Sequence, residues 1–212
     1  FEIIKEKAIS ICVGKKGIGT QEVTVQILGD SFVNGAFFRD ALLSKNYIPG
    51  IKLVGLRNIK NEEGQYDEGR GGWTVKKYFE IPKGEMTSYH GYMQPVGEYR
   101  YWGSCEFWKN CYKVINGELT DTEIVYNCGR YDQCITKFDK ETGYLAAPKK
   151  NDLMYDNARG SYMVYTGKKW KNVEVDERKW AFNYRKYLDM WNLDAPKFFA
   201  QMLGLNDHRD SL

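Results

Sequence analysis

Three short runs of apolar and β-branched residues stand out along the chain, at residues 23–28, 51–56 and 198–203. Continuous apolar runs of this length, bounded by turn residues, predict buried strands. Between the first two runs, residues 37–46 place apolar side chains on one helical face and end before Pro49, which predicts a helix. This alternation of strand and helix indicates an α/β domain built on a parallel sheet.

The composition of the sequence changes between residues 81 and 175, where Gly, Tyr and Trp are frequent and the apolar residues show no helical periodicity. We interpret this segment as an insertion that is largely β or irregular. Before it, residues 75–79 predict the start of a helix, and after it residues 177–191 return to a helical pattern. The apolar side chains of that second helix, which we expect to face the sheet, are Trp180, Tyr184, Tyr187, Leu188 and Trp191.

The resulting organisation has four parts. Residues 1–20 form an N-terminal extension, in which residues 8–13 alternate like a strand and suggest the end of a preceding β domain. Residues 21–80 form the first part of the core. Residues 81–176 form the insertion, and residues 177–212 continue the core.

Composition restricts the classes of function. The 212 residues carry a net charge of +3 without any block of five like charges, so nucleic acid or an anionic membrane is not favoured as the main partner. No apolar run is long enough to cross a membrane. The chain starts at Phe1, so the lack of a signal-peptide pattern carries no conclusion about secretion. Aromatic residues make up 15% of the chain; we favour dense packing in the insertion as the reason, over a surface that stacks on sugar rings.

Four of the five cysteines have mirrored spacing, Cys105-x5-Cys111 and Cys128-x5-Cys134. On two antiparallel strands this spacing would pair Cys105 with Cys134 and Cys111 with Cys128, although connectivity does not follow from sequence alone. Free buried thiols are the alternative. A zinc site is disfavoured because its paired ligands are usually two to four residues apart. Disulfides would indicate an oxidising, extracellular or periplasmic compartment.

Polar residues with the chemistry of acyl transfer follow two of the predicted strands. Ser31, in Gly29-Asp30-Ser31, follows the first strand, and Asn206, in Gly204-Leu205-Asn206-Asp207, follows the last. Sites in parallel sheets form at the carboxyl ends of strands, so Ser31 and Asn206 meet if their strands are neighbours.

A serine nucleophile needs a base to remove its proton and hydrogen-bond donors to stabilise the oxyanion. The backbone N–H of Ser31 and the side-chain amide of Asn206 are two candidate donors. The third is the backbone N–H of Gly72, which lies in the glycine-rich turn of residues 69–72.

Three motifs, in this order, resemble the blocks of the SGNH/GDSL hydrolases. Residues 27–35 (Ile-Leu-Gly-Asp-Ser-Phe-Val-Asn-Gly) resemble the first block, residues 70–74 (Arg-Gly-Gly-Trp-Thr) the second, and residues 204–207 the third. The resemblance covers residues 21–79 and 177–209. It implies a flavodoxin-like three-layer αβα fold, incomplete in this chain and interrupted by the insertion.

The same resemblance implies hydrolysis of esters, often acetyl or acyl groups on carbohydrate or lipid. Ser31 corresponds to the nucleophile, while Gly72 and Asn206 correspond to the oxyanion donors. The expected partner is a small-molecule or glycan ester, and no cofactor or metal is expected. The oligomeric state does not follow from the sequence.

One part of the family pattern is missing. The family takes its base from an Asp-x-x-His block beyond the third block, and no Asp-x-x-His occurs in this sequence. His90 and His208 are the two histidines, and we interpret each as a loop or surface residue rather than a base. We therefore expect the sequence to be a fragment, with the catalytic His and Asp in a missing C-terminal segment, and the fragment itself to be inactive.

Residues beside the motifs have structural alternatives. We expect Asp30 and Asp207 to support their turns and Trp73 to pack, while Arg70 is assigned either to an anionic group of the substrate or to solvent. Two other functions stay open. One is a catalytically inactive SGNH-like module that binds a glycan or a protein partner, and the other is a lipase or thioesterase.

Overall fold

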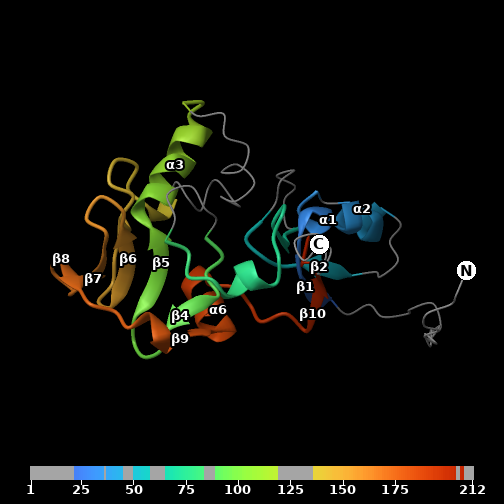
Figure 1. Ribbon diagram of the computed structural model, residues 1–212. Helices are drawn as coiled ribbons and strands as arrows, with labels where there is room; N and C mark the ends of the chain where they lie inside the picture. Colours follow the sequence, from blue (N-terminus) through green and yellow to red (C-terminus); the bar gives the residue numbers. More distant parts are fainter. Residues whose placement is uncertain are drawn as a thin grey trace, which may run out of the picture.

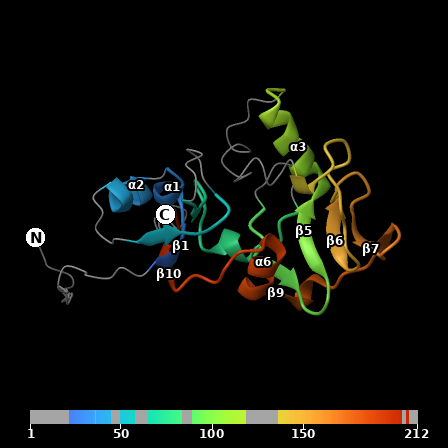
Figure 2. The ribbon, with the colours of Figure 1, turned by 180° about the vertical axis from the view of Figure 1, so that it is seen from behind.

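The computed structural model describes residues 22–35, 37–44, 50–57, 65–83, 89–118, 136–203 and 206–207. Within these residues the protein is a mixed α/β structure with two larger sheets, which lie at opposite ends of the molecule in Figure 1 and in the reverse view of Figure 2. Helix α6 and a short strand pair lie between them. None of the described helices is both long and apolar enough to span a membrane.

The first sheet is parallel and is centred on β1 (Val23–Gly29). β10 (Phe198–Met202) pairs along one side of β1, while β2 (Ile51–Leu53) and β3 (Glu68–Gly69) pair along the other. Gly29 is aligned with Met202 on one side and with Gly69 on the other. The predicted parallel sheet is confirmed, and the strands that precede Ser31 and Asn206 are neighbours.

The two faces of β1 pack differently because successive side chains of a strand point to opposite faces. Ile27 packs with Val33 and Leu53 on the face of α1 (Ser31–Asn34) and α2 (Phe37–Ser44). Gln26 points to the other face, where its Oε1 accepts a 2.5 Å hydrogen bond from the hydroxyl of Tyr184. Tyr184 begins α6 (Tyr184–Trp191), so helices contact the sheet from both faces.

The strand predicted at residues 198–203 exists, but the expectation that it is buried is wrong. Phe198 is 62% exposed and Phe199 is 47% exposed. The reason is position, because among the described residues β10 has β1 as its single partner and forms an edge of the sheet. The continuous apolar run therefore predicted the strand correctly, but it did not show that the strand lies at an edge and that its phenylalanine side chains are exposed.

The second sheet lies within the insertion and has the order β5 (Arg100–Ser104), β6 (Asp152–Asp156), β7 (Ser161–Tyr165) and β8 (Trp170–Val173). β5 and β6 are parallel, while β6, β7 and β8 form an antiparallel meander. The β character predicted for the insertion is confirmed for these strands.

The insertion also contains a helix that the sequence pattern did not predict, α3 (Cys105–Ile115). The side chain of Ser104 accepts a hydrogen bond from Phe107 N and caps the helix. Phe107, Trp108, Cys111 and Tyr112 are buried on it, which is a helical period. The high density of aromatic residues on both sides of this segment hid the period.

One of the two disulfides expected from the mirrored spacing is contradicted by the structure. Cys105 and Cys111 lie on this helix rather than on a strand, six residues and about 120° apart around its axis. Cys105 is a free, buried thiol, so the Cys105–Cys134 pairing is wrong. Cys111 is disulfide-bonded. Cys128 and Cys134 lie outside the described residues, as does the strand expected at residues 8–13.

The helix predicted at residues 177–191 is shorter than expected. A 3₁₀ turn, η2 (Glu177–Lys179), leads into β9 (Trp180–Phe182), which pairs antiparallel with β4 (Met93–Pro95). Trp180 therefore belongs to a strand. α6 begins after Asn183, whose side chain accepts a 2.9 Å hydrogen bond from Lys186 N and so fixes the start of the helix.

One aromatic core extends through much of the described structure. It runs from Leu28 of β1 through Tyr92 and Trp108 of the insertion to Tyr187 and Trp191 of α6. The interpretation of the aromatic content as packing is supported by this burial. Residues before, within and after the insertion belong to this one core. The insertion therefore packs directly against β1 and α6.

In the first sheet, the backbone at Gly69 approaches α1 so closely that glycine is required. A Cβ atom on Gly69 would lie 2.2 Å from Asn34 N, at the end of α1, whereas a Cβ on the neighbouring Gly71 would meet nothing closer than 3.6 Å. We expect Gly69→Ala to lower the free energy of unfolding by about 1–3 kcal/mol through overpacking, and Gly71→Ala to change it by less than about 0.5 kcal/mol. Urea denaturation of the two variants tests this, and equal midpoints would contradict the close approach.

Candidate active site

The first motif forms the turn between β1 and α1. Asp30 is buried and caps α1, where its Oδ1 accepts a 3.1 Å hydrogen bond from Phe32 N. Asp30 N donates to Met202 O of β10, at 3.3 Å. A Cβ on Gly29 would lie 2.3 Å from the side chain of Val33, so this position also requires glycine. The turn is thereby fixed, and it leaves Ser31 exposed at the first position of the helix.

The second motif forms a tight turn after β3. Trp73 N donates to Arg70 O at 3.3 Å, and Gly72 has φ +72° at the third position of the turn, as a type II turn requires. Gly72 is exposed, and a Cβ there would meet no atom within 4 Å. The buried indole of Trp73 packs edge-on against Tyr78, with ring centroids 4.7 Å apart. The packing role expected of Trp73 is therefore confirmed.

The third motif is tied directly to the second. The Asn206 side chain is buried, and its Nδ2 donates a 3.0 Å hydrogen bond to Trp73 O. Both carboxylate oxygens of Asp207 accept from Val75 N, at 3.0 and 3.1 Å. Val75 precedes η1 (Lys76–Phe79), the short 3₁₀ helix found where the sequence predicted a helix to start. Asp207 thus supports the segment that follows the second motif, whereas the sequence predicts that it supports its own turn.

Hydrogen bonds also join the first motif to the second. Arg70 N donates to Gly29 O at 2.8 Å, and the hydroxyl of Tyr78 reaches the same carbonyl at 2.9 Å. The three motifs, separated by more than 130 residues at their widest, therefore meet at one edge of the sheet. The edge is the carboxyl end of β1, β3 and β10, where parallel sheets form sites.

The edge carries donors that are available to a ligand. The backbone N–H groups of Ser31 and Gly72 make no hydrogen bond to any described residue. An amide NH₂ has two protons, and Asn206 uses one of them on Trp73 O. Three N–H donors and one exposed hydroxyl are the elements of an oxyanion-stabilising site for acyl transfer.

Buried charges lie beneath this edge, and the sequence did not reveal them. Arg70 is 1% exposed, so neither of its expected roles, substrate contact or solvent exposure, is correct. Its Nη1 lies 3.0 Å from Oε2 of the buried Glu68, and its guanidinium lies 5.2 Å from the centre of the Trp73 ring. Burial is the largest single effect and disfavours the charge on Arg70, but the Glu68 carboxylate together with Tyr78 and Tyr92 outweighs it and raises the arginine pKa.

A second group of buried charges adjoins the first. Arg57 Nη2 donates to Asn34 Oδ1 at 3.0 Å, and Asp67 Oδ1 accepts from Gly69 N at 2.9 Å. Burial and then the charge of Arg70 lower the pKa of Arg57 to about 10. The sequence pattern did not single out Asp67 and Glu68, which end a polar stretch between the second predicted strand and the glycine-rich turn. Their position immediately before the glycine-rich turn is the signal that could have identified them.

His90 is unsuited to act as the base. It lies in a loop, one of the two expected positions, but it is 1% exposed and so is not a surface residue, and both ring nitrogens have partners. Nε2 donates to Glu80 O at 2.9 Å, and Nδ1 accepts from Tyr92 N at 3.2 Å. Burial and then the charge of Arg70 lower the pKa of His90 to about 3, so the ring is neutral. His208 lies outside the described residues.

An apolar pocket of about 510 Å³ borders the site. Leu28, Val75 and Leu203, which line one part of it, are each within three residues of one of the three motifs' key residues. From there the pocket runs along the face of β10, where Phe199 contributes its ring. Phe79 and Phe182, with ring centroids 5.6 Å apart, also line the pocket, as do Tyr78 and Tyr184.

Comparison of the chain with known protein families, with curated proteins and with solved structures found no match. The motifs and their geometry therefore carry the functional interpretation.

The buried carboxyl of Asp67 predicts a pH dependence of stability. Burial raises the pKa of Asp67 from 3.8 to about 6, against the opposing effects of Gly69 N–H, Arg57 and Arg39. The native state thus binds this proton more tightly than the unfolded state. The contribution of Asp67 to the free energy of unfolding is fully present below the unfolded pKa and is lost as the pH rises through about 6.

We expect the wild-type free energy of unfolding to rise relative to that of Asp67→Asn as the pH falls from 7 to 5, by up to about 1.4 kcal/mol per pH unit. Urea denaturation of both proteins across this range measures the difference. Parallel pH profiles would show that Asp67 titrates normally in the native state.

Proposed function

We propose that this protein is a serine-dependent ester hydrolase of the SGNH/GDSL type that removes acyl groups from a carbohydrate. Ser31 attacks the ester carbonyl, and the N–H groups of Ser31, Gly72 and Asn206 stabilise the oxyanion of the tetrahedral intermediate. The strongest support is the set of hydrogen bonds that joins the three motifs at one sheet edge, above all Asn206 Nδ2 to Trp73 O and Arg70 N to Gly29 O.

The proposal includes the fold. A parallel order β2–β1–β10, with α1 and α2 on one face and α6 on the other, is what the core of a flavodoxin-like αβα fold requires. This strand order supports an SGNH-type core that is interrupted by the insertion. We propose that the insertion begins at about residue 81 and that the core resumes at about residue 177.

The base in this proposal is a histidine outside this sequence. His90 is engaged at both nitrogens and is neutral, and the sequence contains no Asp-x-x-His motif. The coding sequence beyond Leu212 tests this point: an Asp-x-x-His motif there supports the enzyme, and a stop codon supports the inactive module that binds a glycan or a partner.

We expect the 212-residue chain alone to hydrolyse p-nitrophenyl acetate at or near the background rate. In the full-length protein, Ser31→Ala should abolish turnover and Asn206→Ala should lower kcat by roughly 10²–10³-fold, the usual loss for one oxyanion donor. If the 212-residue chain alone showed robust turnover, and Ser31→Ala abolished it, the proposal that the base lies outside this sequence would be refuted. Near-wild-type kcat for Asn206→Ala would remove that residue from the site.

A lipase or thioesterase is the second candidate, and the apolar pocket favours it. A pocket of about 510 Å³ lined by Leu28, Phe79, Phe199 and Leu203 suits a medium or long acyl chain better than an acetyl group. Burying each CH₂ of such a chain contributes about 0.8 kcal/mol, which would appear as a preference for longer esters.

The side chains of β10 offer a matched pair of variants for acyl length. Phe199 lines the pocket, whereas Phe198 points to the opposite face of the same strand. If the pocket holds the acyl chain, Phe199→Ser should lower kcat/KM for p-nitrophenyl octanoate about tenfold while sparing the acetate, since lost apolar contact of this size costs 1–3 kcal/mol. Phe198→Ser should leave the ratio of the two esters unchanged. Equal effects of both variants on the ratio would exclude the pocket from acyl binding.

A further inference from the structure

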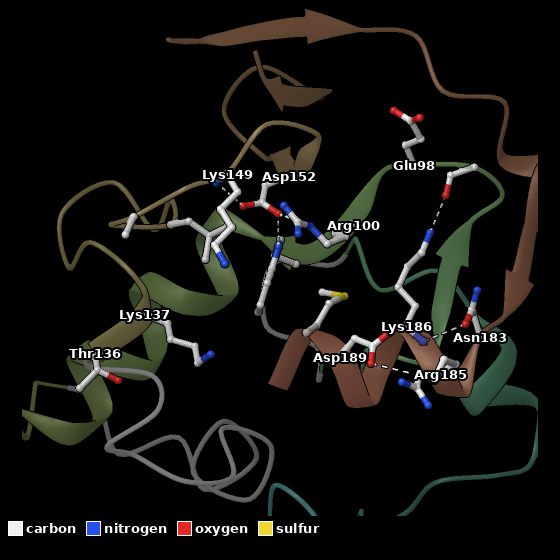
Figure 3. Close-up of a pocket in the computed structure, with 15 residues that line it drawn as sticks. Glu98, Arg100, Thr136, Lys137, Lys149, Asp152, Asn183, Arg185, Lys186 and Asp189 are labelled. Atoms are coloured by element: carbon white, nitrogen blue, oxygen red, sulfur yellow. Dashed lines mark hydrogen bonds and ion pairs between the residues drawn. The ribbon is translucent and has the colours of Figure 1, made fainter. Parts of the chain in front are cut away.

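A second cavity, of about 660 Å³, lies between α6 and the strand pair β5–β6. None of its lining residues belongs to the three motifs. Five cationic side chains and three carboxylates line it, and Figure 3 shows them projecting from α6, from residues 98–100 and from residues 136–152 around a common space. The cavity is therefore lined by charges. Which of these charged side chains already have ion-pair or hydrogen-bond partners decides the sign of the ligand that the cavity can bind.

Three of the five cations are already paired. Arg100 Nε lies 2.8 Å from Asp152 Oδ1, and Arg185 Nε lies 3.1 Å from Asp189 Oδ1. Lys186 Nζ donates to the carbonyls of Pro95, Gly97 and Tyr99 at 2.8–3.1 Å. These charges are satisfied within the protein.

The carboxylate of Asp152, the most buried acid of the cavity, is also fully engaged. Its Oδ1 accepts from Arg100 Nε and from the indole N–H of Trp102, and its Oδ2 accepts from Lys149 N at 2.6 Å. Both oxygens of Asp152 are thus engaged, and among the described residues neither forms an ion pair with the two remaining cations, Lys137 and Lys149.

Lys137 and Lys149 make no ion pair with any carboxylate of the described structure. The ammonium group of Lys137 is half-buried and lies 5.6 Å from the Trp102 ring centre and 5.1 Å from that of Trp191. Burial and then the nearby charge of Lys149 lower the pKa of Lys137. Two neighbouring cations, one of them beside two aromatic rings, thus face the cavity without an ion pair to any described carboxylate (Figure 3). The third carboxylate of the lining, Glu98, accepts a hydrogen bond from Asn151 Nδ2 and pairs with neither lysine.

We propose that this cavity binds an organic anion about the size of one or two sugar rings, through a carboxylate or phosphate group held by Lys137 and Lys149. An anionic group placed between the two ammonium groups relieves their mutual repulsion and forms charge-assisted hydrogen bonds with both. A volume of about 660 Å³ is within the usual range of small-molecule sites. Sugar acids and sugar phosphates share this chemistry.

Isothermal titration calorimetry with glucuronate, glucose 6-phosphate and neutral methyl glucoside tests the site and separates the two sources of the anion. We expect at least one of the anionic sugars to bind, and the neutral sugar not to bind, at concentrations up to about 10 mM. Binding of either anion alone supports the site and identifies its source. Absence of binding by both anions, or equal binding of the neutral sugar, overturns the proposal.

Variants show whether the binding is at this cavity. Lys137→Gln and Lys149→Gln should each weaken anion binding about tenfold or more, the scale of one charge-assisted hydrogen bond. Lys171→Gln, on the exposed strand β8, is the matched control and should leave the affinity unchanged. Undiminished binding in both cavity variants overturns the assignment. Because Lys149 is exposed and has no aromatic contact, Lys149→Gln keeps the test valid if Lys137→Gln unfolds.

The inference is independent of the proposed esterase. Hydrolysis of p-nitrophenyl esters by the full-length protein reports on Ser31, and calorimetry on this chain reports on the cavity, so the two proposals fail separately.

Discussion

The buried carboxylate of Glu68 is the group on which the rest of the structure depends. It is the first residue of β3, where Oε1 accepts from Leu56 N at 2.7 Å and from the hydroxyl of Tyr187, while Oε2 pairs with Arg70. One side chain thereby connects the first sheet, the glycine-rich turn and α6. Burying a charge costs several kcal/mol unless partners offset it. Loss of any one of these contacts would therefore leave part of this cost uncompensated and destabilise the fold.

The geometry of the candidate site follows from this arrangement. Arg70, held by Glu68, donates its backbone N–H to Gly29 O and stacks its guanidinium near Trp73. Trp73 in turn receives the Asn206 amide through its carbonyl. Ser31, Gly72 and Asn206 are thus positioned by buried neighbours rather than by contacts with one another. This is the condition for a preorganised site, because the donors do not have to reorganise when charge develops.

The features that the sequence predicted well are local ones. The strand before Ser31, the helix after it and the glycine-rich turn follow from patterns within about ten residues, and parallel pairing follows from their alternation. The features that it missed depend on distant partners. β10 is exposed because of what lies beside it, Trp180 is in a strand because of residues 93–95, and Cys105 is on a helix rather than opposite Cys134. Arg39, Arg57 and Asp67 are buried, which the sequence pattern did not predict, because burial of a charge depends on partners that are distant in the sequence.

A crystal structure of the full-length protein after reaction with a p-nitrophenyl phosphonate, whose covalent adduct mimics the tetrahedral intermediate, is the most direct test of the proposed site. We expect phosphorus bonded to Ser31 Oγ, with the phosphoryl oxygen about 3 Å from Ser31 N, Gly72 N and Asn206 Nδ2. An adduct on another residue, or a phosphoryl oxygen that points away from Gly72 and Asn206 into solvent, would contradict the proposal.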